Sequence, residues 1–415
     1  MSRDKTSPFE PPVEVVTNAE QLDATCALLR IAGRFAFDTE FIKEDRFEPV
    51  VCLIQLATED RVVLVDPLSE KLDISPLWRL LVDPNLDVIV HAGAEDLGLC
   101  HRYGGALPAR LFDVQIAAGL VGYDYPLSLA RLVRGVIGIR LHKSQTLTDW
   151  QLRPLSATQQ RYAVEDVAYL PAIARTFEAR LAKLSRREWA EEEFARLTKT
   201  AAAHQTDDTA TLARIKGSGS LDARGLAIMR ELVAERYALA ERLNRPPRAV
   251  LKDHLLVEIA RRGWNRPQDI RALRGISLND RSIRQLVDAV TRALALPPDQ
   301  CPVPDEPVEE TPEESVVIAL ATAVLRGWCL ENQLAYPLLT NKQDIRSVVL
   351  AHVRGQPPSH LPPLMSGWRR QVLGPVLDRL MSGSCAVRLK PAKGGPTLTV
   401  EEGKSQPGRP TACGI

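Results

Sequence analysis

The 415-residue sequence lacks the features of a secreted, membrane-embedded or disulfide-stabilised protein. No stretch approaches the roughly 18 uninterrupted apolar residues of a spanning helix, and Met1–Lys5 leads into proline and acidic residues rather than an apolar signal core. The seven cysteines are odd in number and scattered, with no C-x-x-C pair, so they predict neither a disulfide framework nor a cysteine zinc site. We therefore expect a cytoplasmic protein with reduced thiols and no membrane partner.

The chain also lacks an overall excess of charge, since 53 Lys and Arg oppose 52 Asp and Glu. Hydrophobic residues make up 45% and charged residues 25% of the chain, which is ordinary globular usage and excludes wholesale disorder or a collagen-like fibre. At about 100–200 residues per domain, this length predicts two to four domains. The charge balance is therefore informative only when it is divided by segment.

Residues 13–190 combine strand-like and helical patterns. Apolar, strand-like runs occupy Gly33–Phe41, Val50–Thr58 and Arg61–Asp66, and a short strand is predicted at Val88–His91. Strands followed by helices predict an α/β fold with a mixed sheet flanked by helices. Helical periodicity is present at Ile74–Leu81, Ala94–Tyr103, Val114–Val121, Leu127–Ile137 and Ala157–Leu184.

The remainder of the chain has helical patterns only. Residues 208–296 carry 17 Lys and Arg against 10 Asp and Glu, a formal charge of +7, and predict a compact basic helical domain. Residues 297–314 are acidic and proline-rich, which predicts an extended linker. Residues 315–389 are predicted to form a further helical domain, and the Pro/Gly-rich tail 390–415 is predicted to be disordered.

Two carboxylates stand out in the first predicted strand. Side chains alternate along a strand, so Ala36, Asp38 and Glu40 share one face while the phenylalanines of Phe35–Phe41 share the other. Like charges that are partly buried raise each other's pKa and are costly to ionise without a counter-charge, which a divalent cation would supply. The alternative is a strand whose second face is simply wet.

Further acids follow a later predicted strand. Glu95 and Asp96 fall in the first turn of the helix predicted from Ala94, where the helix dipole favours acids without any catalytic role. Their position just beyond a strand end nevertheless lines the crevice in which such sheets bind ligands. His91, at the end of the same strand, is interpreted as a hydrogen-bonded core residue.

Tyr162 and Asp166 lie four residues apart and are therefore neighbours on one helix face. A tyrosine hydroxyl bonded to a core aspartate is the alternative to a catalytic role. Four carboxylates and one phenol together suit Mg²⁺ or Mn²⁺, which prefer hard oxygen ligands. Two such ions about 3.5–4 Å apart can promote phosphodiester hydrolysis. The candidate catalytic set is Asp38, Glu40, Asp96, Tyr162 and Asp166, with the four acids as candidate metal ligands.

The order and spacing of these motifs resemble those of the tyrosine-type, four-acid 3′-5′ exonucleases, and the connecting segments resemble the ribonuclease D family over about residues 13–185. The resemblance implies an RNase H-like fold. It also implies an exoribonuclease that acts on RNA 3′ ends, with tRNA precursors as substrate, and releases nucleoside 5′-monophosphates. The resembling segments are Phe37–Phe41, Leu53–Leu56, Val65–Leu68, His91-Ala92, Glu95–Leu97, Asp149-Trp150, Arg153–Leu155 and Tyr162-Ala163.

The same resemblance implies a role for each member of the set. Asp38, Glu40 and Asp166 would hold the first metal ion. Asp38 would also bridge to the second ion, with Asp96 acting partly through water. Tyr162 would orient the attacking water; because a phenol has a free pKa of about 10, it would do so in its protonated form.

Contacts with the polynucleotide are predicted at four positions. Lys143 and Trp150 lie in a segment that resembles one near the family's active site, whereas residues 45–49 depart from the family's tyrosine-bearing stretch and leave substrate contacts there open. The basic unit resembles an HRDC domain, the helical module shared by RecQ-type helicases and ribonuclease D, and Lys216 and Arg248 are its candidate phosphate contacts. The alternative is a domain that binds only its neighbour.

The family's architecture implies that residues 315–389 are a second, degenerate HRDC-like domain. Two other functions remain open. One is the same chemistry on DNA, because sugar selection depends on contacts to the 2′-hydroxyl that the sequence does not reveal. The other is a catalytically silent nucleic-acid-binding protein, whose signature would be the loss of a metal-binding acid; none is missing here.

Overall fold

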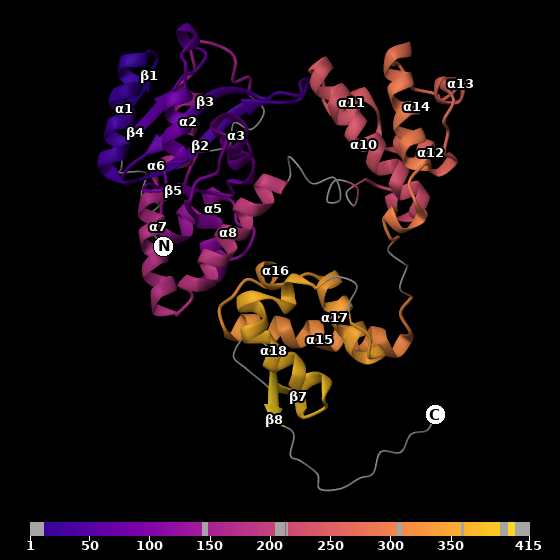
Figure 1. Cartoon of the computed structure of the whole chain (residues 1–415). Coiled ribbons are helices and arrows are strands. Elements are labelled where there is room, and N and C mark those ends of the chain that lie inside the picture. Colours follow the sequence, from indigo (N-terminus) through magenta and orange to yellow (C-terminus); the bar gives the residue numbers. More distant parts are fainter. Residues whose placement is uncertain are drawn as a thin grey trace.

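The computed structural model describes residues 12–142, 148–203, 212, 215–304, 309–357, 361–390 and 397–402 (Figure 1). Its N-terminal part is built on one six-stranded sheet with the order β1-β4-β3-β2-β5-β6. The β2–β3 and β3–β4 pairs are antiparallel and the other neighbours are parallel, so the sheet is mixed as predicted. The strands are β1 (Val13–Val16), β2 (Arg34–Ile42), β3 (Val50–Ala57), β4 (Val62–Val65), β5 (Asp87–Val90) and β6 (Arg110–Asp113).

Helices cover both faces of this sheet. Phe35 and Phe37 of β2 are buried in one cluster with residues of α1 (Ala19–Ala32), α2 (Ser75–Leu81) and α3 (Ala94–Gly104). Ala36, which points the other way, is buried in a second cluster with residues of later helices. The alternation of β2 therefore separates two cores, as the strand pattern predicts. The later helices are α4 (Val114–Leu120), α5 (Leu129–Val136), α6 (Ala157–Ala168) and α7 (Leu170–Lys183).

The single helix predicted over Ala157–Leu184 is wrong, because the structure divides it into α6 and α7 at Tyr169. Pro171 explains the break: it has no backbone N–H to donate to an earlier carbonyl and is tolerated only in the first turn of a helix. The strands β1 and β6 and the helix α1 were not predicted. β1 and β6 are only four residues long, and the strands with which they pair are remote in sequence. The sequence of α1 mixes polar and apolar residues.

The basic unit is helical, as predicted, and has its own core, which includes Leu232, Leu256 and Leu286. Its longest helix ends at Asn244, which takes a left-handed conformation with φ of 45°. Its helices are α10 (Ala223–Leu243), α11 (Pro247–Val250), α12 (Asp253–Arg262), α13 (Pro267–Arg271) and α14 (Asp280–Leu294).

The C-terminal unit contains α15 (Pro312–Glu331), α16 (Tyr336–Leu339), α17 (Lys342–Arg354) and α18 (Gly367–Met381). It packs on α8 (Arg187–Ala203) of the N-terminal part, below the sheet in Figure 1. Trp368 stacks on Trp189 with ring centroids 4.7 Å apart, and Arg369 forms a buried ion pair with Glu193. This unit therefore shares one hydrophobic cluster with the N-terminal domain.

Two boundary predictions are wrong. Helix α15 begins at Pro312, inside the predicted linker 297–314, because Thr311 and Glu314 form a reciprocal capping box. The helical domain predicted over 315–389 ends instead in an antiparallel hairpin of β7 (Cys385–Lys390) and β8 (Thr397–Glu402), and β8 falls inside the tail 390–415 that was predicted to be disordered. The rest of that tail, residues 391–396 and 403–415, lies outside the described residues. Val387 and Leu398 of this hairpin pack on the shared cluster. No helix in the described ranges is long and apolar enough to cross a membrane.

Candidate active site

The central strand β2 presents Asp38 and Glu40 on the face of the sheet that α6 covers. Their hydrogen-bonded neighbour β3 is irregular beside them: Glu40 pairs with Leu53, but Phe41 pairs with Val51. Cys52 is therefore the extra residue of a β-bulge that lies between Leu53, the partner of Glu40, and Val51, the partner of Phe41. Bulges are frequent beside active sites because they redirect side chains.

Helix α6 supplies two more of the predicted residues, Tyr162 and Asp166. It begins with a capping box in which the Ser156 hydroxyl accepts from the Gln159 backbone N–H and the Gln159 side chain accepts from the Ser156 N–H. One and two turns further on, Tyr162 and Asp166 follow on the same face. The well-defined start of the helix thus sets the position of both residues against the sheet.

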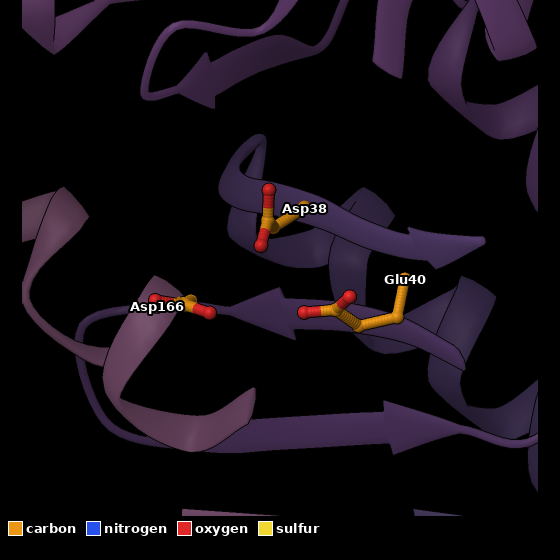
Figure 2. A group of neighbouring side chains, drawn as sticks. All are labelled: Asp38, Glu40 and Asp166. Carbon is orange, nitrogen blue, oxygen red and sulfur yellow. The ribbon is translucent and has the colours of Figure 1, made fainter. Parts of the chain in front are cut away.

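Figure 2 shows Asp38 and Glu40 of β2 and Asp166 of α6 with their carboxylates turned toward one another. Each offers an oxygen, and these three oxygens lie within 4.8 Å of one another. Asp96 is not part of that close group. It is buried at the start of α3, where its carboxylate accepts a hydrogen bond from the Thr39 hydroxyl of β2.

The pKa values of these acids reflect a crowded, buried cluster. Burial, followed by the charge of Asp96, raises the pKa of Asp38 well above its ordinary range. Burial and then the charges of Asp166 and Asp96 raise the pKa of Glu40 to about 8. Burial raises the pKa of Asp96 to about 6 despite the hydrogen bond from Thr39. Burial also raises the pKa of Asp166 to about 7, although a hydrogen bond from Tyr162 lowers it.

The donor set suits a divalent metal. Within the described part of the chain, no Lys, Arg or His forms an ion pair with any of the four acids, so the repulsion among them has no protein counter-charge. Carboxylate oxygens at this density are the ligands that Mg²⁺ and Mn²⁺ prefer. The family-type acidic cluster therefore implies a divalent metal, which would replace the missing positive charge.

Tyr162 lies beside this cluster. Burial, followed by the charges of Asp166, Glu40 and Asp38, raises the pKa of its hydroxyl above the ordinary value of 10. The phenol is therefore protonated at neutral pH and can donate a hydrogen bond. Its ring packs against Trp150, with centroids 6.0 Å apart.

The predicted polynucleotide contacts have mixed outcomes. Trp150 is only 5% exposed, so the structure gives it a packing role against Tyr162 rather than a surface on which a base could stack. Lys143 lies outside the described residues. Lys216 is exposed, and Arg248 is exposed with an ion pair to Asp253 at 3.0 Å. Both remain predictions of phosphate contact.

The stretch 45–49, which departs from the expected family pattern, contacts the basic unit. The backbone N–H groups of Phe47 and Glu48 donate to the side-chain oxygen of Asn244 at 3.2 and 3.1 Å. The Phe47 ring lies edge-on to Tyr237 of α10. The loop after β2 is therefore a contact point between the catalytic sheet and the basic helices (Figure 1).

Some residues that hold the candidate site in place carry no signal in the local sequence pattern. Thr39 faces the same way as the phenylalanines of β2 but reaches Asp96, and nothing in the local pattern signals that pairing. Arg153 was noted only within a segment that resembles the family, and Gln159 only within a predicted helix, so neither was assigned a role. His91 has the predicted structural role: its Nε2 lies 2.9 Å from the Leu127 carbonyl oxygen.

Comparisons with known proteins agree with this arrangement. Residues 13–182 match a family model described as a 3′-5′ exonuclease, and residues 225–293 match that of the HRDC domain. The chain is 31% identical to ribonuclease D of Bartonella henselae over 94% of this chain and 97% of that protein. It is 33% identical to ribonuclease D of Gluconacetobacter diazotrophicus over 92% and 96% of the two chains.

Among solved structures, that of Escherichia coli RNase D, described as an exoribonuclease involved in structured RNA processing, superposes with a TM-score of 0.74. The identity is 27%, and the match covers 90% of this chain and 99% of that one. The likeness thus extends through all three parts of the chain rather than over the sheet alone.

Proposed function

Because the chain belongs to the ribonuclease D family, we propose that it is a metal-dependent 3′-5′ exoribonuclease that acts in the cytoplasm. The observation that carries this proposal is the meeting of Asp38, Glu40 and Asp166 from elements more than a hundred residues apart in the chain. Such a cluster is costly to fold without a cation, so its presence favours a site built for metal. The products would be nucleoside 5′-monophosphates.

The four acids and Tyr162 would have separate roles in the reaction. Asp38, Glu40 and Asp166 would hold one Mg²⁺ or Mn²⁺ ion, and Asp38 together with Asp96 would hold a second. When bound, two ions would neutralise the acids, lower the pKa of a water molecule and stabilise the charge on the phosphodiester. The Tyr162 hydroxyl, protonated because its pKa is raised, would orient that water by hydrogen bonding rather than accept its proton.

The basic helical unit would hold the polynucleotide. Its formal charge of +7 favours phosphate contacts that bind without reading sequence. Lys216 and Arg248 are the proposed contacts, and the loop at 45–49 would keep the unit beside the catalytic sheet. By family resemblance, the RNA would be a structured one, with tRNA precursors as the proposed substrate.

The test is hydrolysis of a 5′-labelled RNA and of the matching DNA, in Mg²⁺, in Mn²⁺ and in chelator. We expect metal-dependent shortening of RNA from its 3′ end, with mononucleotide products. Asp38→Asn should remove hydrolysis while RNA binding persists in a filter-binding assay. Equal activity in chelator, or in the Asp38→Asn variant, would refute the metal mechanism.

The DNA arm of this test separates the two polymers. Faster shortening of DNA than of RNA would replace the proposed substrate with its competitor and leave the metal chemistry intact. A wild-type chain that binds RNA but shortens neither polymer would identify a silent binding protein.

A further inference from the structure

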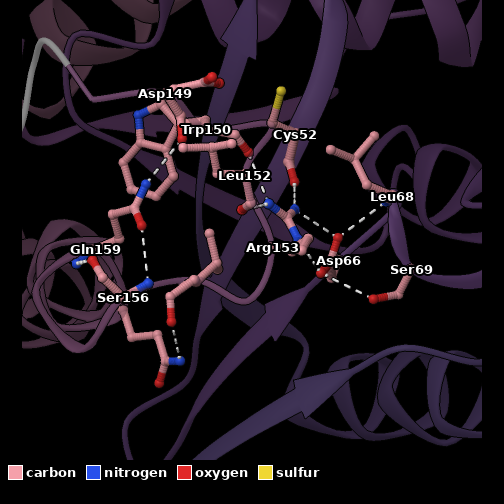
Figure 3. A network of polar contacts seen from close by, with 12 residues as sticks. Cys52, Asp66, Leu68, Ser69, Asp149, Trp150, Leu152, Arg153, Ser156 and Gln159 are labelled. Atoms are coloured by element: carbon pink, nitrogen blue, oxygen red, sulfur yellow. Dashed lines mark hydrogen bonds and ion pairs between the residues drawn. The ribbon is translucent and has the colours of Figure 1, made fainter.

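Arg153 lies in the segment 148–156, which runs between the sheet and the start of α6 (Figure 3). All five of its guanidinium N–H groups find an acceptor. Two form a forked pair with Asp66, from Nε at 2.5 Å and from Nη2 at 2.7 Å. Nη2 also donates to the Cys52 carbonyl at 2.7 Å, and Nη1 donates to the carbonyls of Trp150 and Leu152 at 2.8 and 2.9 Å.

The carbonyl of Cys52 belongs to the bulge that directly adjoins Leu53, the partner of Glu40. An extra residue in a strand disrupts the regular ladder and needs other hydrogen bonds to hold its conformation. Arg153 supplies one, from a guanidinium that Asp66 in turn fixes. The bulge beside a candidate metal-binding acid is therefore held by a side chain from a segment about 100 residues further along the chain.

The same segment is tied to α6. Gln159, which is buried, donates from its side-chain amide to the Thr148 hydroxyl and to the Asp149 carbonyl, both at 3.1 Å. Next to these residues, Trp150 packs on Tyr162. The Trp150 carbonyl accepts a hydrogen bond from Arg153. One guanidinium therefore holds both the residue whose ring packs on Tyr162 and the bulge next to the partner of Glu40.

We propose that Arg153 is a positioning residue for hydrolysis: through Cys52 it sets the direction of Glu40, and through Trp150 it sets the place of Tyr162. This inference rests on the proposed function, because it assigns a role within that reaction. Arg153 touches neither the acids nor the phenol directly. It keeps the strand and the helix that carry them in one geometry, and a displacement of about 1 Å at a reacting group can cost about 100-fold in rate.

The chemistry requires arginine. A planar guanidinium presents donors in a fixed fork that matches a carboxylate, whereas lysine offers three donors from a single point and cannot reproduce the pair. Asp66 is also constrained, since it accepts from the Leu68 backbone N–H and the Ser69 hydroxyl, each at 3.0 Å. Although burial opposes ionisation of Asp66, the hydrogen bonds and charge of Arg153 lower its pKa below the ordinary value.

The test uses the full-length chain with Arg153→Lys, which keeps the charge and loses the fork. We expect kcat on RNA to fall by about 10- to 100-fold while KM changes by less than about threefold. The Mg²⁺ concentration for half-maximal activity should rise by about 10-fold, because loss of the residues that orient metal ligands weakens binding to this extent.

A double-mutant cycle with Tyr162→Phe measures the coupling between the two residues, which general destabilisation of the fold would not change. If Arg153 acts partly by placing the phenol, the loss caused by Arg153→Lys should be smaller in the Tyr162→Phe background than in the wild type. If Arg153→Lys does not fold by circular dichroism, Gln159→Ala tests the α6 end of the same connection in the same way.

The matched control is Arg369→Lys. Arg369 also makes a buried forked pair, with Glu193, and donates to the carbonyls of Leu338 and Leu339, but it lies between α8 and α18, away from the acids. It should leave kcat and the Mg²⁺ dependence within about twofold of wild type, since residues without shared partners act independently.

The proposal is overturned if Arg153→Lys retains wild-type kcat, if only KM changes, if its effect simply multiplies that of Tyr162→Phe, or if Arg369→Lys causes the same loss. A wild-type chain inactive on RNA would instead overturn the proposed function itself. An active wild type with an equally active Arg153→Lys variant would remove the positioning role alone.

Discussion

Replacing Glu40 with glutamine is expected to stabilise the metal-free exonuclease domain at neutral to alkaline pH. Burial and then the charges of Asp166 and Asp96 raise the pKa of Glu40 to about 8, from 4.5 for an ordinary glutamate. Between these values the folded chain retains a proton that the unfolded chain has lost. The free energy of unfolding must therefore fall as pH rises from about 4.5 to about 8, and glutamine, which has no proton to lose, removes this contribution.

The size of the effect follows from the two pKa values. For one group that titrates at 4.5 in the unfolded chain and at about 8 in the folded chain, linkage gives a loss of about 3.5 kcal/mol between about pH 5 and about pH 8. The Glu40 side chain keeps some solvent contact, which screens its charge. We therefore expect the wild-type chain to lose about 1–3 kcal/mol more than Glu40→Gln over this range.

Hydrogen exchange of peptides from β2 and β3, in chelator, is the suitable assay, because unfolding of a chain with several domains is not two-state. The opening free energy of these strands is measured at several pH values for wild type and for Glu40→Gln. The difference between the two slopes gives the contribution of Glu40 together with its effect on Asp38, whose pKa the charge of Glu40 helps to raise.

Equal slopes in the two proteins, or a wild-type sheet that becomes more stable relative to Glu40→Gln as pH rises, would refute the reasoning.

Mg²⁺ provides a further check. If the acids bind it in their ionised form, saturating Mg²⁺ should reduce the fall in the wild type more than in the variant, because metal binding releases the protons that burial had retained and the variant has one such acid fewer.

Four further changes test other parts of the protein. Asp38→Asn should lower kcat by about 1,000-fold or more, since loss of metal binding removes several kcal/mol of charge stabilisation; single-turnover RNA hydrolysis measures it. Tyr162→Phe should lower kcat by about 100-fold without changing Mg²⁺ affinity, because only the orientation of water is lost; a metal titration of activity checks both. Lys216→Ala should reduce the slope of log affinity against log salt by about 1 for RNA, as measured by filter binding. Arg369→Ala should destabilise the junction with the C-terminal unit by about 3–5 kcal/mol, because it leaves the Glu193 charge buried and unpaired; protease cleavage near α18 would report it.

Local sequence patterns predicted much of the exonuclease sheet. The runs that became β2, β3, β4 and β5 are strongly apolar or alternating, and such patterns mark buried strands wherever they occur. The break between α6 and α7 was within reach of the same reasoning, because Pro171 carries its own steric signal. The hairpin of β7 and β8 was not, since short strands acquire stability only from the partner and the surface on which they pack.

In the candidate site, too, local patterns predicted some features and tertiary packing decided the others. Alternation in β2 and the spacing of Tyr162 and Asp166 placed these residues on defined faces, and the family resemblance joined them into a set. That Asp38, Glu40 and Asp166 come within 4.8 Å, while Asp96 bonds to Thr39, depends on how the helix and the sheet pack. Trp150 illustrates the limit: the resemblance of its segment to one near the family's active site indicated a polynucleotide contact, and only its neighbours reveal that its ring is buried against Tyr162.

The sequence by itself determined the strands β2, β3, β4 and β5, the helical character and basic charge of the middle unit and the acids available to hold metal, because these depend on residue type and on spacing within one element. The tertiary structure alone decided the bulge at Cys52, the five hydrogen bonds of Arg153 and the shared core of the first and last units. The bonds of Arg153 to Asp66 and Cys52 span 87 and 101 positions, and the shared core joins the first and last units of the chain. The bulge is a backbone irregularity that no local pattern encodes. Their energies arise only when the elements meet.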